Sequence, residues 1–482
     1  MLRRTKIVAT LGPASSDPKI LERMIQAGVD VIRINFAHGT KEEHLEIIEL
    51  ARSLARSSGH VIGVLADLQG PKIRIGRFED GSISLKTGDP FILDADCNLG
   101  NQERVGLDYK ELPNDVESGV TLILDDGRIV LNVSRVKGNQ IFCTVKQGGI
   151  LSNNKGINRK GGGLSAPALT SKDMEDIKTA AEFKADYLAV SFPRSGQDMA
   201  IARDLMNQAG GKSLLMAKIE RKEAIIALDD ILNASDAIMV ARGDLSVEVG
   251  DAAVPALQKR MIRAARTNNK IVVTATQMME SMNSSQVPTR AEVSDVANAV
   301  LDGTDAVMLS SESATGQYPV ETVEAMARIC LEAEKEYHGD LELRRIQGGM
   351  PDTIEEAVSR ATMFTAGSLK IAAIAALTQS GFTAMLMSRK SSNVPIFALS
   401  PQLDTRRKVT LFRGVYPVNF SGKFQDPEII LNRAENELLA RGAVKIGDLI
   451  LITIGEPVGK AGGTNTMKIV KVGDHLNTQI KN

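Results

Sequence analysis

The stretch Leu214–Asp244, LLMAKIERKEAIIALDDILNASDAIMVARGD, decides the fold of this chain. Its two apolar runs, LLMA and AIMV, have the length of buried strands, and the segment between them has apolar residues at helical spacing. This pattern predicts a β-α-β unit of a parallel sheet. The first strand ends in Lys218 and Glu220, and the second ends in Arg242 and Asp244. Parallel sheets place their chemistry at such carboxyl ends.

Two interpretations of these charged strand ends are open. In one, Lys218 and Glu220 only pair with each other where the strand leaves the core. In the other, carboxylates that follow two consecutive strands form a site for a metal ion and an anion. Glu220 and Asp244 offer the oxygen ligands that Mg²⁺ prefers, and Lys218 offers a compact positive charge for a developing anion. We favour the second interpretation because neighbouring strands share the feature.

The β-α rhythm continues on both sides of this unit and predicts eight parallel strands, the number that closes a barrel. The predicted strands are Lys6–Leu11, Val29–Ile34, Val61–Ala66, Tyr187–Phe192, Leu214–Lys218, Ala237–Ala241, Lys270–Thr276 and Ala306–Leu309. We therefore expect an α/β fold with a (β/α)8 TIM barrel as the catalytic domain, in segments 1–70 and 168–345. Together these segments have the length of a typical barrel of this kind, about 250 residues.

Two further domains are expected. In segment 71–167 the helical period disappears, and turn pairs such as Asp80-Gly81 and Gly138-Asn139 separate short alternating runs, which predicts a small all-β barrel inserted as a lid. Segment 346–482 predicts an open α/β regulatory domain. Its expected elements are a helix at Thr353–Leu369 and strands at Ile371–Leu377, Pro395–Leu399, Val415–Phe420, Asp448–Ile454 and Met467–Val472.

A loop rich in hydroxyl groups follows the first strand of the C-terminal segment. Thr378, Ser380 and Thr383 surround Gly381 where a helix is expected to begin. Such a loop can cradle a phosphate group, because the N-terminus of a helix presents backbone N–H groups. An ordinary capped turn would have the same residues. Both interpretations remain open from the residues alone.

Composition excludes several classes of protein. The 482 residues include 58 Lys and Arg against 59 Asp and Glu, so we expect no nucleic-acid partner. No apolar run approaches membrane-spanning length, and Gly12-Pro13 interrupts any signal-peptide pattern, so we expect no membrane association. The three cysteines are far apart, which suits a reducing compartment. These observations predict a cytoplasmic protein.

Charged and polar residues lie at the ends of six of the predicted barrel strands. They are Arg33 and Asn35, Asp67 and Arg74, Lys218 and Glu220, Arg242 and Asp244, Thr276 and Gln277, and Ser311 and Glu312. Such a mixture suits substrates rich in phosphate and carboxylate groups. The surrounding motifs are RINFAHG (33–39), ADLQGPKIR (66–74), MAKIE (216–220), MVARGDL (239–245), ATQMMESM (275–282), PTRAEVSDVANAVLDGTDAVMLS (288–310) and TNTM (464–467). Together they resemble the pyruvate kinase family, over nearly the whole chain.

The resemblance implies transfer of the phosphoryl group of phosphoenolpyruvate to ADP, giving ATP and an enolate that is protonated to pyruvate. It implies that Glu220 and Asp244 bind Mg²⁺ or Mn²⁺. Lys218 would neutralise the charge on the phosphoryl group and the enolate, and Arg33 would hold the phosphoryl group. These expectations agree with the metal-and-anion interpretation of the strand ends.

The remaining site residues also come from the resemblance. The backbone of Gly243 and Asp244, with the Thr276 hydroxyl, would hold the substrate carboxylate, and Thr276 would lie on a proton path to the enolate. Water, relayed through Ser311 and Glu312, is a candidate proton donor. The nucleotide phosphates would be bound by residues from four segments: Asn35, His38, Arg74 and Lys172.

One departure from the family pattern concerns the monovalent cation. Asn35 and Asp67 are kept, but Ala37 and Leu68 stand where K⁺-dependent members have Ser and Thr, and Lys72 stands where they often have Glu. We expect the Lys72 ammonium to replace the cation, so that K⁺ is not required. The alternative is that Lys72 is a solvated hinge residue.

The family resemblance also extends to regulation and assembly. The loop with Thr378, Ser380 and Thr383 is similar to the effector site of the family, which implies activation by a phosphorylated sugar or a nucleotide monophosphate. A homotetramer is implied as well. Two other functions compete: another Mg²⁺-dependent barrel enzyme that stabilises an enolate, and a catalytically silent regulator that binds a metabolite. Formation of pyruvate that depends on ADP would exclude both.

Overall fold

The structure is a computed structural model that describes residues 2–336, 350–390, 392–422, 426–457 and 462–474. Eight parallel strands form a closed barrel in the order β1-β18-β17-β16-β15-β14-β3-β2, which confirms the predicted TIM barrel. The barrel strands are β1 (Lys6–Thr10), β2 (Val31–Asn35), β3 (Gly63–Asp67), β14 (Tyr187–Val190), β15 (Leu214–Ile219), β16 (Ala237–Ala241), β17 (Ile271–Ala275) and β18 (Ala306–Leu309).

The barrel strands are buried along almost their whole length. Every residue of β1, β3, β14, β16, β17 and β18 is buried. Strands of a parallel sheet are covered on both faces, so they need continuous apolar runs rather than alternating ones. This is why the runs AIMV and AVML were visible as strands in the sequence.

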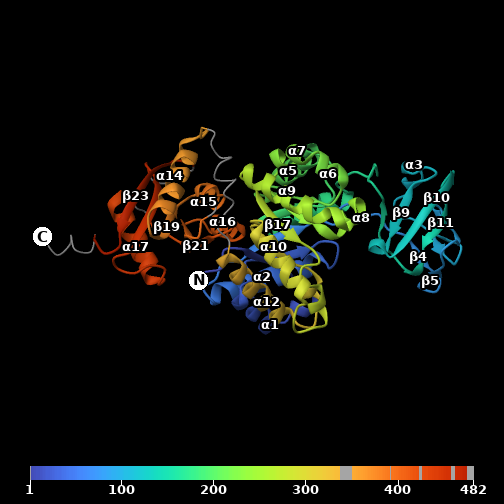
Figure 1. The fold of residues 1–482 in the computed structure, drawn as a ribbon, viewed down its shortest axis with the longest axis horizontal. Coiled ribbons are helices and arrows are strands. Elements are labelled where there is room, and N and C mark those ends of the chain that lie inside the picture. The colour runs from blue at the N-terminus through green and yellow to red at the C-terminus, as the bar shows by residue number, and fades with distance from the viewer. Residues whose placement is uncertain (1, 337–349, 391, 423–425, 458–461, 475–482) are drawn as a thin grey trace. The chain divides into compact units, whose positions relative to one another are not determined.

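Helices alternate with the barrel strands (Figure 1). They are α1 (Pro18–Ala27), α2 (Lys41–Ser57), α4 (Ser171–Glu182), α5 (Gly196–Gln208), α6 (Lys222–Ile226), α7 (Leu228–Ala234), α8 (Arg242–Val249), α9 (Val254–Thr267), α10 (Arg290–Leu301), α11 (Ser311–Ala314) and α12 (Pro319–Lys335). The local sequence determines where several of these helices begin. Thr40 and Glu43 form a capping box at α2, Thr289 and Glu292 form one at α10, and Asp17 caps α1.

The segment after β3 is all-β apart from one short α-helix, α3 (Leu112–Asp115), and one 3-10 helix (Asp125–Gly127). Its strands are β4 (Arg77–Phe78), β5 (Ser82–Leu85), β6 (Pro90–Asp94), β7 (Leu99–Gly100), β8 (Arg104–Val105), β9 (Thr121–Leu124), β10 (Ile129–Lys137), β11 (Gln140–Gln147), β12 (Gly149–Ser152) and β13 (Ile157–Arg159). They pair as a six-stranded sheet, β13-β9-β10-β11-β6-β8, and two two-stranded sheets, around one hydrophobic core.

The C-terminal segment is an open α/β sheet, as predicted. Its strands are β19 (Ile371–Leu377), β20 (Ile396–Ser400), β21 (Val415–Asn419), β22 (Leu449–Gly455) and β23 (Thr464–Lys471), in the order β21-β20-β19-β22-β23 with β23 antiparallel to β22. Its helices are α14 (Ile354–Ser368), α15 (Phe382–Ser388), α16 (Leu403–Lys408) and α17 (Pro427–Ala440). Short 3-10 helices occur at Pro13–Ser15, Asp125–Gly127, Asp251–Ala253, Glu280–Asn283 and Val409–Leu411.

The chain divides into two compact units. The first unit comprises residues 1–66, 183–187 and 262–482, and the second comprises residues 67–182 and 188–261. The expected boundary between residues 345 and 346 lies outside the described residues. In the described part of the chain, no helix combines the length and the apolar character that crossing a bilayer requires.

Candidate active site

Lys218 is the centre of a polar cluster in the second unit. It lies near the carboxyl end of β15, and its side chain is only 12% exposed. Its Nζ is 3.0 Å from Oε1 of Glu220 and 3.4 Å from Oδ1 of Asp67, and it donates to the Ser191 hydroxyl at 2.8 Å. Ser191 in turn donates to the Leu68 carbonyl at 2.7 Å. Residues that follow three neighbouring strands thus hold one ammonium group.

Glu220 is almost completely buried, with 1% of the residue exposed. Its Oε2 accepts a hydrogen bond from the backbone N–H of Phe192 at 2.9 Å. Phe192 has φ 55°, a left-handed conformation that is uncommon for a bulky residue. Burial raises the pKa of Glu220, the Lys218 ammonium lowers it, and the Asp244 and Asp67 carboxylates raise it further. The site therefore favours a further positive charge beside Glu220.

Asp244 lies in the first turn of α8, which begins directly after β16. Its Oδ1 is 3.0 Å from Nζ of Lys72, and the two side chains are 20% and 28% exposed. Gly243 precedes it, and the Gly243 carbonyl accepts from the Ser246 hydroxyl at 2.8 Å. Because the first turn of a helix presents backbone N–H groups, Gly243 and Asp244 are suitably placed to bind an anion.

The carboxylates of Glu220 and Asp244 are chemically suited to bind a divalent metal ion. No group of three or more His, Cys, Asp or Glu side chains in the described ranges is arranged to hold a metal ion. Glu220 and Asp244 would supply two carboxylates, and Mg²⁺ usually takes one or two carboxylates and completes its shell with water and substrate oxygens. The raised pKa of Glu220, caused chiefly by burial, also fits, because a bound cation would stabilise the ionised form.

Arg33, Asn35 and His38 belong to the first unit. The guanidinium of Arg33, on β2, donates to the Thr10 hydroxyl at 2.9 Å, and Thr10 donates to the Leu309 carbonyl at 2.8 Å. The side chain of Asn35 accepts from the backbone N–H of Ala37 at 3.1 Å. His38 is exposed. Strands β1, β2 and β18 therefore fix Arg33 at their carboxyl ends.

His44 lies on the buried face of α2. His44 is 9% exposed, it makes an edge contact with Phe36 at 4.9 Å between ring centroids, and its Nε2 bonds to the His38 carbonyl at 2.8 Å. Helix α2 therefore packs this face against the loop that follows β2.

Thr276 also belongs to the first unit, directly after β17. Thr276 and Gln277 have φ 66° and 54°, so two consecutive residues other than glycine adopt a left-handed conformation. Such strain costs about 1–3 kcal/mol per residue and is concentrated at functional sites. Glu312 is 1% exposed, and its carboxylate accepts from the backbone N–H groups of Ser310 and Met279, at 2.7 and 3.2 Å. Glu312 thus holds the loops that follow β17 and β18.

The expected nucleotide-binding cations of the second unit lie on its surface. The Arg74 guanidinium donates to the Asn154 carbonyl at 3.2 Å, and its backbone N–H donates to Asp108 at 2.7 Å. The Lys172 ammonium, 51% exposed, forms an ion pair with Asp176 one helical turn away at 2.5 Å. Both side chains are accessible to a ligand.

The hydroxyl-rich loop of the C-terminal sheet lines a cavity of about 90 Å³. Thr378 accepts from the N–H of Gly381 at 2.8 Å, and Ser380 accepts from the N–H of Phe382 at 3.3 Å. The hydroxyl of Thr383 is buried and bonds to the hydroxyl of Thr464 at 2.7 Å. The capped turn and the cavity are therefore both present, and Ser380 is the exposed hydroxyl of the three.

Two contributors and one pairing were missed in the sequence. Ser191 holds the Lys218 ammonium, and Thr10 holds Arg33. Lys72 was predicted as a site residue, but its ion pair with Asp244 was not. Ser191 and Thr10 both stand at or next to the end of a predicted strand, which is the available signal. No pattern in the sequence specifies the partner of Lys72, because 172 residues separate it from Asp244.

An ammonium group among buried carboxylates, at the carboxyl end of a closed parallel barrel, defines a barrel enzyme that acts on anionic substrates. The family model for the barrel domain of pyruvate kinase matches residues 2–323, and the model for its alpha/beta domain matches residues 356–470. The chain belongs to the pyruvate kinase family, and it is a phosphotransferase.

Several relatives match over almost their full length. Pyruvate kinase from Buchnera aphidicola subsp. Acyrthosiphon pisum is 52% identical over 98% of this chain and 99% of the relative. Pyruvate kinase II from Salmonella typhimurium is 51% identical over 98% of this chain and 99% of the relative. Pyruvate kinase from Haemophilus influenzae is 52% identical over 94% of this chain and 96% of the relative.

Proposed function

We propose that this enzyme transfers the phosphoryl group of phosphoenolpyruvate to ADP with the help of Mg²⁺ or Mn²⁺. The bond between phosphorus and the enol oxygen breaks, a bond from phosphorus to a terminal oxygen of ADP forms, and the enolate takes a proton at its methylene carbon. The observation that carries the proposal is the Lys218 ammonium, fixed 3.0 Å from the buried Glu220 carboxylate. A buried positive charge of this kind stabilises the negative charge that develops on the reacting oxygens.

The other residues have roles that follow from their positions. We propose that Arg33, held by Thr10, grips the phosphoryl group, and that the amides of Gly243 and Asp244, with Thr276, hold the substrate carboxylate. Glu220 and Asp244 would hold the metal, which when bound supplies positive charge to the phosphoryl and enolate oxygens. Asn35, His38, Arg74 and Lys172 would bind the nucleotide.

The proposal is tested by a coupled assay of pyruvate formation from phosphoenolpyruvate. We expect turnover only when ADP and a divalent cation, Mg²⁺ or Mn²⁺, are both present. Pyruvate released without ADP would indicate a different enolate-stabilising enzyme, and a lack of turnover under all conditions would contradict the proposal.

We also propose that the enzyme works without K⁺, because the Lys72 ammonium supplies a fixed positive charge 3.0 Å from Asp244. In tetramethylammonium buffers of matched ionic strength, adding K⁺ is expected to change kcat less than about twofold. The variant Lys72→Glu is expected to lose activity without K⁺ and to regain part of it with K⁺, since the cation would then replace the lost charge. Severalfold stimulation of the unaltered enzyme by K⁺ would contradict this prediction.

We propose that the loop with Thr378, Ser380 and Thr383 binds the phosphate of an activating sugar phosphate or nucleotide monophosphate. All three residues line the same cavity, which supports a binding role in addition to capping. Sigmoidal kinetics relieved by the effector are expected. The variant Ser380→Ala should raise the effector concentration for half activation about fivefold or more, because a hydrogen bond to a charged group contributes about 1.5–3 kcal/mol, and should leave the basal rate unchanged.

The matched control for this prediction is Ser368→Ala. The Ser368 hydroxyl is exposed on α14 and bonds only locally, to the Phe364 carbonyl. Equal activation curves for Ser380→Ala and the unaltered enzyme would contradict the proposal that this loop binds the effector. Thr383 is a less suitable test, since its hydroxyl is buried against Thr464 and its loss would disturb packing.

Three further expectations are part of the proposed function: a cytoplasmic location, a homotetramer, and a three-domain division into a barrel (1–70 and 168–345), a β lid (71–167) and a C-terminal domain (346–482). The matches to separate barrel and alpha/beta family models support the separation of the barrel from the C-terminal domain. Light scattering on the purified enzyme would determine the number of subunits.

A further inference from the structure

Three consecutive glycines, Gly161–Gly163 (the glycine loop), follow β13 at the end of the all-β segment after β3 (the β segment). All three have a left-handed backbone, with φ +88°, +80° and +92°. Glycine adopts this conformation without the strain that a β-carbon would add. The chain between β13 and α4 therefore follows a course that other residue types would not adopt readily.

The glycine loop projects from the β segment. The N–H of Lys160, just before the loop, donates to the Thr121 carbonyl in β9 at 3.0 Å. Leu164 and Ala166, just after the loop, are 9% and 1% exposed and belong to the hydrophobic core of the β segment. Because the residues on both sides are anchored in the β segment, movement of the loop and movement of that segment are coupled.

The projecting loop contacts two helices of the barrel in the second unit. The N–H of Gly161 donates to the Glu248 carbonyl in the last turn of α8, at 3.3 Å. The N–H of Gly163 donates to Oε1 of Glu223 in α6, in a short hydrogen bond. The carbonyls in the last turn of a helix have no partner within the helix, so the Gly161 N–H satisfies one of them.

Glu223 and Glu248 are also connected to each other. Oε2 of Glu248 accepts from the backbone N–H of Lys222 at 2.8 Å, and Lys222 is the residue before Glu223. Oε2 of Glu223 is buried and has no hydrogen-bond partner among the described residues, so the Gly163 N–H fixes this carboxylate through Oε1. The glycine loop, α6 and α8 thus form a ring of hydrogen bonds.

The ring includes the two chain segments that carry the proposed metal ligands. Glu220 lies three residues before Glu223, and Asp244 lies four residues before Glu248 in the same helix. Helix α8 also contacts β13 and the 3-10 helix Asp125–Gly127 of the β segment. The position of the β segment is therefore linked to the backbone that presents both carboxylates.

We propose that Glu223 is a positioning residue, which holds the glycine loop against α6 and α8 and thereby ties the β segment to the helices beside Glu220 and Asp244. Its effect on the reaction rests on the proposed function, whereas its effect on the loop does not. A covering segment that docks on a site excludes water and completes that site. Loss of the tie lowers the fraction of the enzyme that is ready to bind substrate, which raises KM.

The first test is limited trypsin cleavage of the full-length protein without substrates, followed by mass spectrometry at the bond between Lys160 and Gly161. Lys160 is exposed, but the Gly161 N–H is bonded to α8, so cleavage requires release of the loop. Glu223→Ala should speed cleavage about tenfold or more, because a hydrogen bond to a charged group is lost. Glu223→Gln keeps an acceptor and should stay within about threefold of the unaltered protein. Glu175→Ala, at a carboxylate 71% exposed on α4, should not change the rate.

Two glycine variants separate the displacement of Glu223 from backbone strain. A β-carbon at Gly162 would collide with the Glu223 carboxylate, whereas one at Gly161 would meet no atom within 4 Å. Both positions have a positive φ, so alanine is strained at each. Gly162→Ala should therefore speed cleavage about fivefold more than Gly161→Ala. Each rate is divided by that of a synthetic peptide with the same sequence, which removes the preference of trypsin itself.

Steady-state kinetics then test the role in the reaction. Glu223→Ala should raise KM for phosphoenolpyruvate about fivefold and change kcat less than about twofold, and Glu223→Gln should restore KM. Unchanged cleavage in Glu223→Ala, or equal cleavage in the two glycine variants, would overturn the proposed tie. Faster cleavage with an unchanged KM would overturn its role in the reaction. Absence of turnover in the unaltered enzyme would count against phosphoryl transfer instead, and the cleavage rates would still decide whether Glu223 holds the loop.

Discussion

The variant Lys218→Met is expected to lower kcat for pyruvate formation by on the order of 10²–10³ or more. Methionine keeps the length and apolar stem of lysine but removes the charge that lies between Glu220, Asp67 and Ser191. Two unit charges about 4 Å apart at an effective dielectric constant of 20 attract by about 4 kcal/mol, so the loss is large. Steady-state kinetics with saturating phosphoenolpyruvate and ADP measure the effect.

The matched control is Lys222→Met, four residues later in the chain. Lys222 is exposed at the start of α6, and its removal should leave kcat within about twofold. Circular dichroism should show that both variants are folded. A Lys218→Met enzyme that retained a tenth or more of the activity would refute the central role given to this ammonium group.

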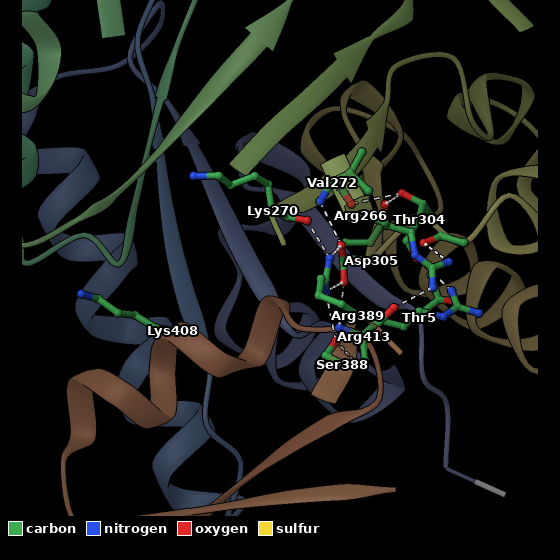
Figure 2. A network of polar contacts seen from close by, with 12 residues as sticks. Thr5, Arg266, Lys270, Val272, Thr304, Asp305, Ser388, Arg389, Lys408 and Arg413 are labelled. Atoms are coloured by element: carbon green, nitrogen blue, oxygen red, sulfur yellow. Dashed lines mark hydrogen bonds and ion pairs between the residues drawn. The ribbon is translucent and has the colours of Figure 1, made fainter. Parts of the chain in front are cut away.

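The variant Arg389→Met is expected to give the largest loss of stability, about 3–5 kcal/mol. Arg389 and Asp305 are each 1% exposed at the side chain, and their ion pair connects the end of α15 to the residue that precedes β18 (Figure 2). Removal of one partner leaves a buried carboxylate without its main counter-charge. The midpoint of the first urea transition and the hydrogen exchange of β18 and β20 would report this loss.

Arg441→Met serves as the control for this prediction. Arg441 pairs with Glu437 on the surface of α17, with exposures of 44% and 29%, and such a pair contributes about 0.3–0.5 kcal/mol. The double variant Asp305→Asn with Arg389→Met should lose less than the sum of the two single variants, since the pair acts as a unit. Equal destabilisation by Arg389→Met and Arg441→Met would mean that the buried pair contributes little.

The barrel was predictable from sequence because its strands carry a strong local signal. Strands β16 and β18 span the predicted residues 237–241 and 306–309, since continuous burial demands continuous apolar runs. The sheet order of the segment after β3 was harder to predict. Its strands alternate, and its sheets join partners as distant as β6 and β11, so turn residues predicted the strands but not the order of the six-stranded sheet.

The candidate site was predictable in its charges but not in its pairings. Lys218, Glu220 and Asp244 follow strands, and a parallel barrel brings strand ends together. The ion pair between Lys72 and Asp244 depends on how the chain leaves the barrel after β3, which no local pattern encodes. The left-handed backbone at Thr276 and Gln277 was also invisible, because neither residue type requires it.

The tight packing around Gly70 has a consequence for how this enzyme can be varied. Gly70 has φ +67°, and a β-carbon placed there would lie 2.6 Å from the β-carbon of Ser191, whose hydroxyl accepts from Lys218. Gly70 also separates Asp67 from Lys72 along one continuous backbone. A single added methyl group at this position would therefore displace Ser191, whose hydroxyl accepts a hydrogen bond from the Lys218 ammonium. It would also alter the backbone that leads to Lys72. Natural or laboratory variants of the loop after β3 are therefore expected to keep glycine at position 70.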